Sequence, residues 1–151
     1  MINGVRVKQL KLIPDQRGRL MEILRSDDTI FRKFGQVYMT TAYPGVVKGW
    51  HYHKVQYDNF TCVRGTMQLV LYDARKDSPT HKEINEFFIG LDNPLVVQIP
   101  PNVLHGFKAA GNEEVIVINV PTEVYHTKKP DEYRIPSNSK KVPYDWNRKD
   151  G

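Results

Sequence analysis

The 151-residue chain contains only one cysteine, Cys62, so no disulfide can form within it. Its apolar runs are short, as in residues 115–117, and none approaches the length that crosses a membrane. The N-terminus also lacks the continuous apolar segment of a secretory signal. A lone thiol is typical of proteins in a reducing compartment. We therefore expect a cytoplasmic protein without a membrane-spanning segment.

No basic helix is evident, although basic residues outnumber acidic ones by 22 to 17 and the net charge is +5. Such a surplus can serve either nucleic acid or a small anionic ligand. Near the C-terminus the basic residues are interleaved with acidic ones, which is typical of a solvated surface. We therefore expect a phosphorylated small molecule as the partner, rather than nucleic acid or a membrane.

Short runs of β-branched and aromatic residues follow one another from Gln36 onward, separated by turn residues such as Pro44-Gly45. The length of the chain favours one domain, residues 1–151, with a substantial core. Many short strands at this spacing indicate an all-β sandwich or barrel. The expected strands cover residues 37–43, 46–52, 59–64, 67–73, 83–89, 95–99, 104–109 and 114–120.

The two ends of the chain differ from this pattern. Residues 1–25 are expected to form arm strands around a turn that contains proline and glycine. One short helix is expected over residues 29–34, because residues 26–28 can cap its start and Gly35 can end it. Residues 126–151 are rich in proline and charge, and we expect them to wrap the surface of the domain.

Two histidines, His51 and His53, stand one residue apart in one of the expected strands. Alternate residues of a strand point to the same face, so both imidazoles are expected on one side of a sheet. Asp58 follows closely, and His105 lies in a later strand that can pair nearby. Three imidazoles and a carboxylate that converge in this way can bind a divalent transition metal.

This pattern resembles the two sequence motifs of the cupin jelly rolls, a double histidine in the first and a lone histidine in the second. Asp58 is shorter than the usual acidic ligand, and Asn102 stands where the motif has glycine. Hydrogen-bonded histidines without a metal are the other interpretation. We expect no cofactor, and we keep as the alternative one divalent transition metal bound by His51, His53, Asp58 and His105.

Five sequence segments occur in order along nearly the whole chain. They are Asp15-x-Arg17-Gly18-x-Leu20-x-Glu22, Gly45-Val46-Val47-Lys48-Gly49-Trp50-His51-Tyr52, Cys62-Val63-x-Gly65, Tyr72-Asp73-x-Arg75-x2-Ser78-Pro79-Thr80 and Ile99-Pro100-x4-His105-Gly106-Phe107. Together they resemble the dTDP-4-dehydrorhamnose 3,5-epimerase family, a branch of the cupin jelly rolls. The resemblance implies a cupin-type jelly-roll barrel or sandwich, a homodimer, and an enzyme that works without a metal.

The resemblance also implies the reaction: epimerisation of a nucleotide-diphosphate-linked 4-keto-6-deoxy sugar in surface-polysaccharide or rhamnose biosynthesis. Epimerisation beside a ketone needs a base that removes a proton, an acid that returns one, and a group that stabilises the enolate. By resemblance His51 is the base, Tyr125 is the acid, and Asp73 is an aspartate of the site. The substrate-binding residues implied in the same way are Arg17, Leu20, Glu22, Lys48, His53 and His105.

Among these, Arg17, Leu20 and Glu22 match an arm that in the family contacts the nucleotide of a neighbouring subunit. Lys48 stands where the family usually has an arginine, so it can contact the diphosphate but without the two-pronged guanidinium. His53 stands where the family has a glutamine. It is the residue that this chain adds to the family's pattern.

Two groups of the family's site are not found in the sequence. Asp58 stands where the family has a lysine near the enolate oxygen, and His53, Lys54, Lys48 or a bound metal can replace that lysine. The aspartate that orients the base has no counterpart, and Asp73 or Asp58 can take its place. These departures leave two other functions open. One is a metal-dependent cupin enzyme, and the other is a catalytically degenerate protein that binds sugar nucleotides.

Overall fold

The computed structural model describes residues 1–147, which form twelve strands and no helix. Within this part of the chain no helix is long and apolar enough to span a bilayer. The strands are β1 (Arg6–Gln9), β2 (Leu12–Asp15), β3 (Gly18–Met21), β4 (Tyr38–Ala42), β5 (Val47–Tyr52), β6 (Asp58–Arg64), β7 (Met67–Tyr72), β8 (Ile84–Ile89), β9 (Leu95–Ile99), β10 (Leu104–Ala109), β11 (Val115–Asn119) and β12 (Tyr133–Arg134).

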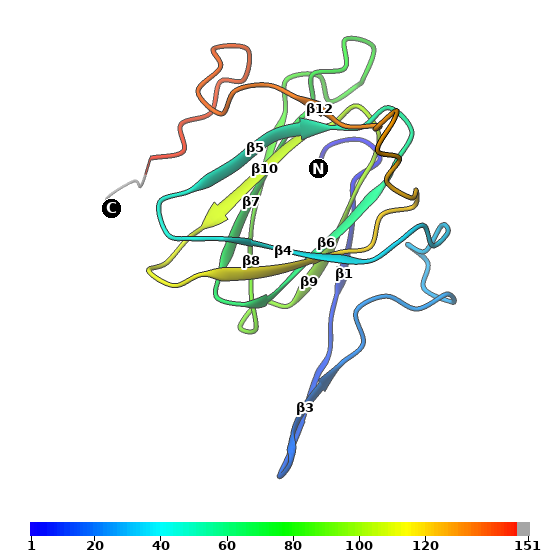
Figure 1. The fold of residues 1–151 in the computed structure, drawn as a ribbon, viewed down its shortest axis with the longest axis vertical. Helices are drawn as coiled ribbons and strands as arrows, with labels where there is room; N and C mark the ends of the chain where they lie inside the picture. The colour runs from blue at the N-terminus through cyan, green and yellow to red at the C-terminus, as the bar shows by residue number, and fades with distance from the viewer. Residues whose placement is uncertain (148–151) are drawn as a thin grey trace.

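Two five-stranded antiparallel sheets form a sandwich (Figure 1). The first sheet has the order β1-β9-β6-β11-β4, and the second has the order β12-β5-β10-β7-β8. The prediction of an all-β, cupin-like sandwich is therefore confirmed, and the sheets do not close into a barrel. Every strand expected from Gln36 onward is present, with each end within one residue of the expected position.

The main core lies between the two sheets, where alternate residues of the strands point inward. Leu69 and Leu71 of β7, Val97 of β9 and Val117 of β11 are completely buried in it. Cys62 of β6 belongs to the same cluster, and its thiol is free. The lone cysteine therefore serves as a small hydrophobic residue of the core.

β2 and β3 form a separate hairpin that extends away from the sandwich (Figure 1). β1, which the sequence assigns to the same arm, pairs instead with β9 at the edge of the first sheet. The arm thus consists of residues 12–21. Its side chains Ile13 and Leu20 occupy paired positions and are exposed although they are apolar.

The short helix predicted over residues 29–34 is wrong. The carboxylate of Asp28, expected as a helix cap, instead accepts a hydrogen bond of 2.5 Å from Lys8 Nζ. Further along, the backbone N–H of Gly35 donates to the carbonyl of Pro121 at 3.0 Å. A helix of this length is marginal by itself, so contacts with distant parts of the chain outweigh the local capping signal.

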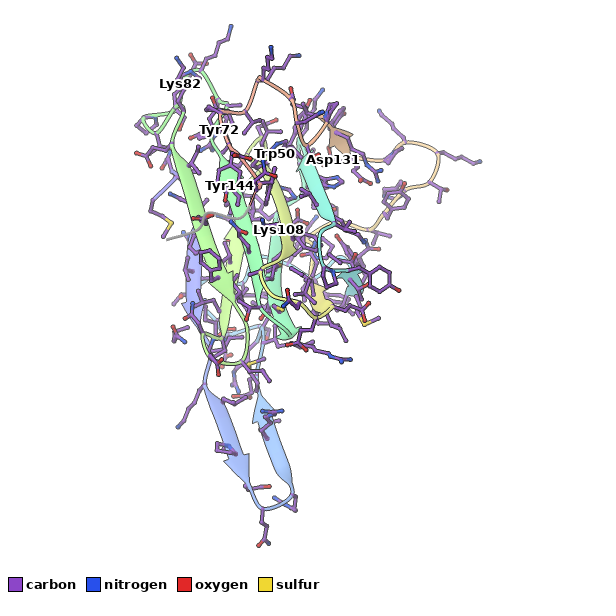
Figure 2. All side chains as sticks on the ribbon, turned by 90° about the vertical axis from the view of Figure 1, so that its left-hand side faces the viewer. Trp50, Tyr72, Lys82, Lys108, Asp131 and Tyr144 are labelled. Atoms are coloured by element: carbon purple, nitrogen blue, oxygen red, sulfur yellow. The ribbon has the colours of Figure 1, made fainter. Side chains whose placement is uncertain are left out.

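The C-terminal segment covers the outer face of the second sheet, where Figure 2 shows Trp50, Tyr72 and Tyr144 close together. The ring centroids of Trp50 and Trp146 lie 5.0 Å apart. Trp50 and Ile135 exchange two backbone hydrogen bonds of 2.9 Å. These contacts hold β12 against β5, and they bring the residues just before β12 to the cavity described next.

Candidate active site

A cavity of about 1130 Å³ opens into the sandwich, lined by β4, β5, β6 and β10 and by residues from segments 123–126 and 129–136. This volume lies slightly above the range of about 300–1,000 Å³ that is typical of small-molecule sites. Five of the predicted site residues meet on its walls. They are Lys48, His51, His53, His105 and Tyr125.

Pairing of β5 with β10 explains how the histidines come together. His51 and His105 are directly paired across the two strands. His53 is the residue just after β5, and it lines the same cavity as His51, as the alternation of extended backbone predicts. The ring centroids of His51 and His105 are 6.3 Å apart, and those of His53 and His105 are 5.6 Å apart. The prediction that both histidines of the first motif share one face therefore agrees with their positions.

His51 has a carboxylate partner that the sequence did not reveal. Its Nδ1 lies 3.3 Å from Oε1 of Glu132, which also accepts a hydrogen bond of 2.6 Å from Arg134. Burial lowers the pKa of His51 below its ordinary value, although the charge of Glu132 opposes this shift. The imidazole is therefore neutral near pH 7, which is the state in which it can accept a proton.

Glu132 reaches His51 because β12 pairs with β5, with Arg134 opposite His51 and Tyr133 opposite Tyr52. A strand of two residues is too short to show the alternation of apolar and polar residues by which strands are recognised in a sequence. The sequence pattern therefore does not predict β12. The carboxylates that the sequence offered as partners of the base, Asp73 and Asp58, lie elsewhere.

Asp58 is almost fully buried and contacts the other two histidines. Its Oδ2 lies 3.0 Å from Nε2 of His53 and 3.3 Å from Nε2 of His105. Its Oδ1 accepts hydrogen bonds of 2.8 Å from the side-chain amides of Gln56 and Asn119. The two amide donors fix Oδ1 as an acceptor and leave Oδ2 directed at the histidines.

The two histidines beside Asp58 differ in protonation. Burial works against the charge of His53, but its hydrogen bond and charge interaction with Asp58 outweigh burial and raise the pKa of His53 to about 9. Complete burial lowers the pKa of His105 to about 4, although Asp58 favours the charged form. Burial likewise disfavours a charged Asp58, but the hydrogen bond from His53 keeps the pKa of the carboxyl below its ordinary value.

The structure places Asp73, predicted as a catalytic residue, outside the cavity. Its carboxylate accepts hydrogen bonds from the guanidinium of Arg75 (2.8 Å) and from the hydroxyls of Ser78 (2.6 Å) and Thr80 (2.7 Å). Its side chain is fully enclosed by these partners. Asp73 thus organises the loop after β7 and does not face the histidines.

The predicted nucleotide-contacting residues of the arm also lie outside the cavity of their own chain. Arg17 is paired with Asp15 at 2.6 Å, and Glu22 is paired with Arg25 at 2.8 Å. Leu20 is 60% exposed. Arg17 and Leu20 belong to the hairpin, which extends away from the sandwich (Figure 1), and none of the three residues lines the cavity.

Two tyrosines line the cavity. Tyr125, the predicted acid, is half exposed. Tyr38 of β4, which the sequence did not single out, accepts a hydrogen bond of 2.9 Å from Asn119, and burial raises the pKa of Tyr38 to about 12. Lys48 also lines the cavity, and its Nζ donates to the hydroxyl of Thr40 at 3.0 Å. Both phenols and the amine of Lys48 therefore line the same cavity.

Residues 13–133 match the family model described as the polysaccharide biosynthesis C-terminal domain. The chain is 44% identical over 148 residues to "Probable low-salt glycan biosynthesis epimerase Agl13" of Haloferax volcanii, with 97% of this chain and 95% of the relative covered. It is 40% identical over 147 residues to spore coat polysaccharide biosynthesis protein SpsL of Bacillus subtilis, with 97% of each covered.

Among solved structures, the dTDP sugar isomerase of Desulfovibrio desulfuricans G20 superposes with a TM-score of 0.91 at 30% identity, covering 96% of this chain and 92% of that one. Near-complete coverage means that the whole sandwich, including the strands that carry the histidines, is shared. The chain therefore belongs to the polysaccharide biosynthesis C-terminal domain family and is a member of the dTDP-4-dehydrorhamnose 3,5-epimerase group of sugar-nucleotide epimerases.

Proposed function

We propose that this protein epimerises a carbon beside the keto group of a nucleotide-diphosphate-linked 4-keto-6-deoxy sugar, in cytoplasmic synthesis of a surface polysaccharide. The observation that carries the proposal is the His51–Glu132 pair on the wall of a cavity of about 1130 Å³. The names of relatives support the substrate class, since one is a glycan biosynthesis epimerase and another a dTDP sugar isomerase.

In this proposal His51 removes the proton next to the ketone. Burial keeps its imidazole neutral in the free enzyme, and proton uptake turns it into an imidazolium. The carboxylate of Glu132, 3.3 Å from Nδ1, then stabilises the new positive charge and holds the ring in place. Removal and return of the proton are acid–base steps, so the reaction needs no redox cofactor.

Return of the proton to the opposite face of the sugar needs an acid across the cavity from His51. Tyr125, in the segment that follows β11, is the proposed acid, because it lines the same cavity and is reachable from solvent. Tyr38 is the second candidate, since β4 belongs to the sheet opposite β5. A matched pair of Tyr→Phe variants separates the two roles.

The basic side chains of the cavity suit a diphosphate. Lys48, Lys129 and Arg134 all line it. A cation near a diphosphate makes charge-assisted hydrogen bonds, which are about twice as strong as neutral ones. Lys48 is the proposed diphosphate contact, as the resemblance implies.

We also propose a homodimer in which the arm of one copy contacts the nucleotide bound by the other. The arm contributes no residue to the cavity of its own chain, and it presents the apolar side chains Ile13 and Leu20 to solvent. Contact with a second copy would cover them and would bring Arg17 and Glu22 to a bound nucleotide.

Solvent deuterium exchange tests the proposed reaction. Incubation with a dTDP-linked 4-keto-6-deoxy sugar in D₂O is expected to place deuterium at C3 or C5, detected by mass spectrometry and NMR. The variant His51→Asn should slow this exchange by at least about 100-fold, since general-base catalysis contributes about 10²–10⁴. The variant His81→Asn, at an exposed histidine outside the cavity, is the control and should retain the wild-type rate. Unchanged exchange in His51→Asn protein would show that the base is wrongly assigned.

A further inference from the structure

One acidic side chain, that of Asp131, joins the C-terminal segment to the loop that follows β5. Asp131 lies just before β12 and beside β5 (Figure 2). Its Oδ1 accepts a hydrogen bond of 2.8 Å from the backbone N–H of Lys54. Its Oδ2 accepts two more, of 2.9 Å from Val55 and 3.0 Å from Gln56. One carboxylate therefore binds three successive N–H groups of a distant segment.

The main chain of Asp131 is held as well. Its carbonyl oxygen contacts Nδ1 of His53. The preceding residues 124–130 are all exposed, whereas Asp131 is partly buried. Asp131 is thus the point at which the chain returns to the sandwich after an exposed stretch.

The loop that Asp131 binds is itself anchored at both ends. At its start, the carbonyl of His53 accepts a hydrogen bond of 2.7 Å from the backbone N–H of Asn102. At its end, the N–H of Tyr57 donates to the hydroxyl of Thr122 at 3.0 Å, and the carbonyl of Tyr57 accepts from the N–H of Thr122 at the same distance. Asp131 is therefore bound to a loop that is tied to the segments after β9 and β11.

The next residue after Asp131 is Glu132, the partner of His51. The other ion pair of Glu132, with Arg134, involves a guanidinium that is 71% exposed. Such exposed ion pairs contribute little to holding a side chain in one place. Consecutive Cα atoms are only about 3.8 Å apart, so a shift of the backbone at Asp131 is passed on to Glu132.

We propose that Asp131 is a positioning residue, which fixes the backbone before β12 so that the carboxylate of Glu132 reaches Nδ1 of His51. Asp131 itself does not touch the reacting atoms in this proposal. The inference deepens the proposed function, and its kinetic part rests on that function.

The variant Asp131→Ala tests the role, because it removes all three hydrogen bonds to the loop. The rate of deuterium exchange into the dTDP-linked sugar, per folded molecule, should fall by about 10–100-fold, since a misplacement of about 1 Å can cost about 100-fold. Urea unfolding gives the folded fraction. An unchanged rate would overturn the proposal.

Asn85→Ala is the matched control for a loss of stability. Oδ1 of Asn85 accepts a hydrogen bond of 2.8 Å from the backbone N–H of Ile2, which is also distant in sequence, and Asn85 does not line the cavity. This variant loses a long-range hydrogen bond of the same kind. It should exchange deuterium at the wild-type rate per folded molecule.

A double-mutant cycle separates positioning from a general structural role. If Asp131 acts through Glu132, the variant that carries both Asp131→Ala and Glu132→Gln should be as slow as Glu132→Gln alone, within about twofold. The effects of independent sites would instead multiply. A double variant slowed by the product of the two single effects would overturn the proposal.

The imidazole of His51 provides a readout that needs no substrate. A carboxylate only accepts, so the neutral ring donates Nδ1–H to Glu132. The ¹⁵N chemical shifts of the two ring nitrogens, measured at one pH, distinguish this tautomer from the other. Asp131→Ala should lower the population of the Nδ1–H tautomer, and Asn85→Ala should not. A wild-type tautomer population in Asp131→Ala protein would overturn the positioning role.

The proposed function fails by a different result. A wild type that places no deuterium in the sugar would refute the epimerisation, and the tautomer of His51 would still decide the role of Asp131. Full exchange by both the wild type and Asp131→Ala would refute the positioning role and leave the epimerisation standing.

Discussion

At the scale of single residues, the imidazole of His51 takes its properties from two opposing neighbours. Burial and the positive charge of Arg134 lower its pKa, whereas the carboxylate of Glu132 raises it. Since burial is the larger effect, the ring is neutral at physiological pH. The neutral imidazole of His51 can therefore accept a proton, and Glu132 lies close enough to stabilise the imidazolium that results.

The variant Glu132→Gln is expected to lower the pKa of His51 further, because it removes the charge that favours the imidazolium. The acidic limb of the pH–rate profile should therefore move to lower pH, and kcat/KM should fall by about 10–100-fold, part of the general-base contribution. Histidine NMR titration checks the pKa directly.

A matched variant, Arg134→Gln, removes a charge that lowers the pKa of His51, so the NMR titration should move in the opposite direction. A titration of His51 that is the same in both variants and in the wild type would rule out Glu132 as its positioning residue. A purely structural role of Glu132 would not produce shifts of opposite sign.

Asp73 is expected to act on stability and not on catalysis. Its hydrogen bonds with Arg75, Ser78 and Thr80 hold its pKa well below the ordinary value. The variant Asp73→Asn should lower the free energy of unfolding by about 1–3 kcal/mol, measured by urea unfolding. The rate of deuterium exchange into the sugar, per folded molecule, should equal that of the wild type. A loss of this exchange without a loss of stability would show that Asp73 acts in catalysis.

The pH dependence of this effect follows from the direction of the shift. A carboxyl whose pKa is lowered in the folded state contributes stability above its unfolded value of about 3.9, and this contribution is lost as the pH falls. The difference in stability between wild type and Asp73→Asn should therefore be constant near neutrality and should shrink below about pH 4.

At the scale of elements, the shortest strand, β12, is the one that completes the environment of the proposed base. β12 has only two residues, yet it places Glu132 beside His51. Its position depends on the backbone pair between Trp50 and Ile135 and on the aromatic packing of Trp146 against Trp50. The C-terminal segment is therefore part of the site, although most of it lies on the outer surface (Figure 2).

The variant Trp146→Ala is expected to loosen β12. Loss of a large aromatic contact should lower the free energy of unfolding by about 3 kcal/mol or somewhat less, because Trp146 is only partly buried. Hydrogen exchange at the amides of Trp50 and Ile135 should become faster than at the amides of β9. The control is Phe88→Ala, an exposed aromatic residue of β8, which should leave both amides protected.

Two other elements present apolar side chains to solvent. The β2–β3 hairpin exposes Ile13 and Leu20, and the edge strand β4 exposes Met39, which is 61% accessible. An edge strand with free backbone groups and apolar neighbours is a typical site for association with another chain.

At the scale of the whole molecule, the proposed dimer makes a prediction about mass in solution. Wild-type protein should elute with the mass of two chains in size-exclusion chromatography with light scattering. Leu20→Asn should weaken the dimer, because it places an amide where an apolar contact is expected. Arg19→Asn, at the neighbouring position on the other face of the hairpin, should leave the mass unchanged. A wild-type monomer would contradict this part of the proposal.

Most of the sandwich was predictable because its signals are local. Alternating apolar residues fixed the eight strands from Gln36 onward, and the i, i+2 spacing placed His51 and His53 on one face. The helix over residues 29–34 was wrong for the opposite reason. Its capping signal is local, but the interactions that override it come from Lys8 and Pro121, which are distant in sequence.

The sequence by itself determined the strands, the shared face of the two histidines and the likeness to sugar-nucleotide epimerases. These depend on side-chain period, turn residues and motif order, all of which are readable along the chain. The sequence also grouped Asp58 with His53 and His105, but only the tertiary structure decided that the partner of His51 is Glu132 and that Asp73 belongs to a separate loop network. A carboxylate and an imidazole form a hydrogen bond only when their atoms are about 3 Å apart. The order of residues along the chain does not show which of the 17 acidic residues the fold brings within that distance of a given histidine.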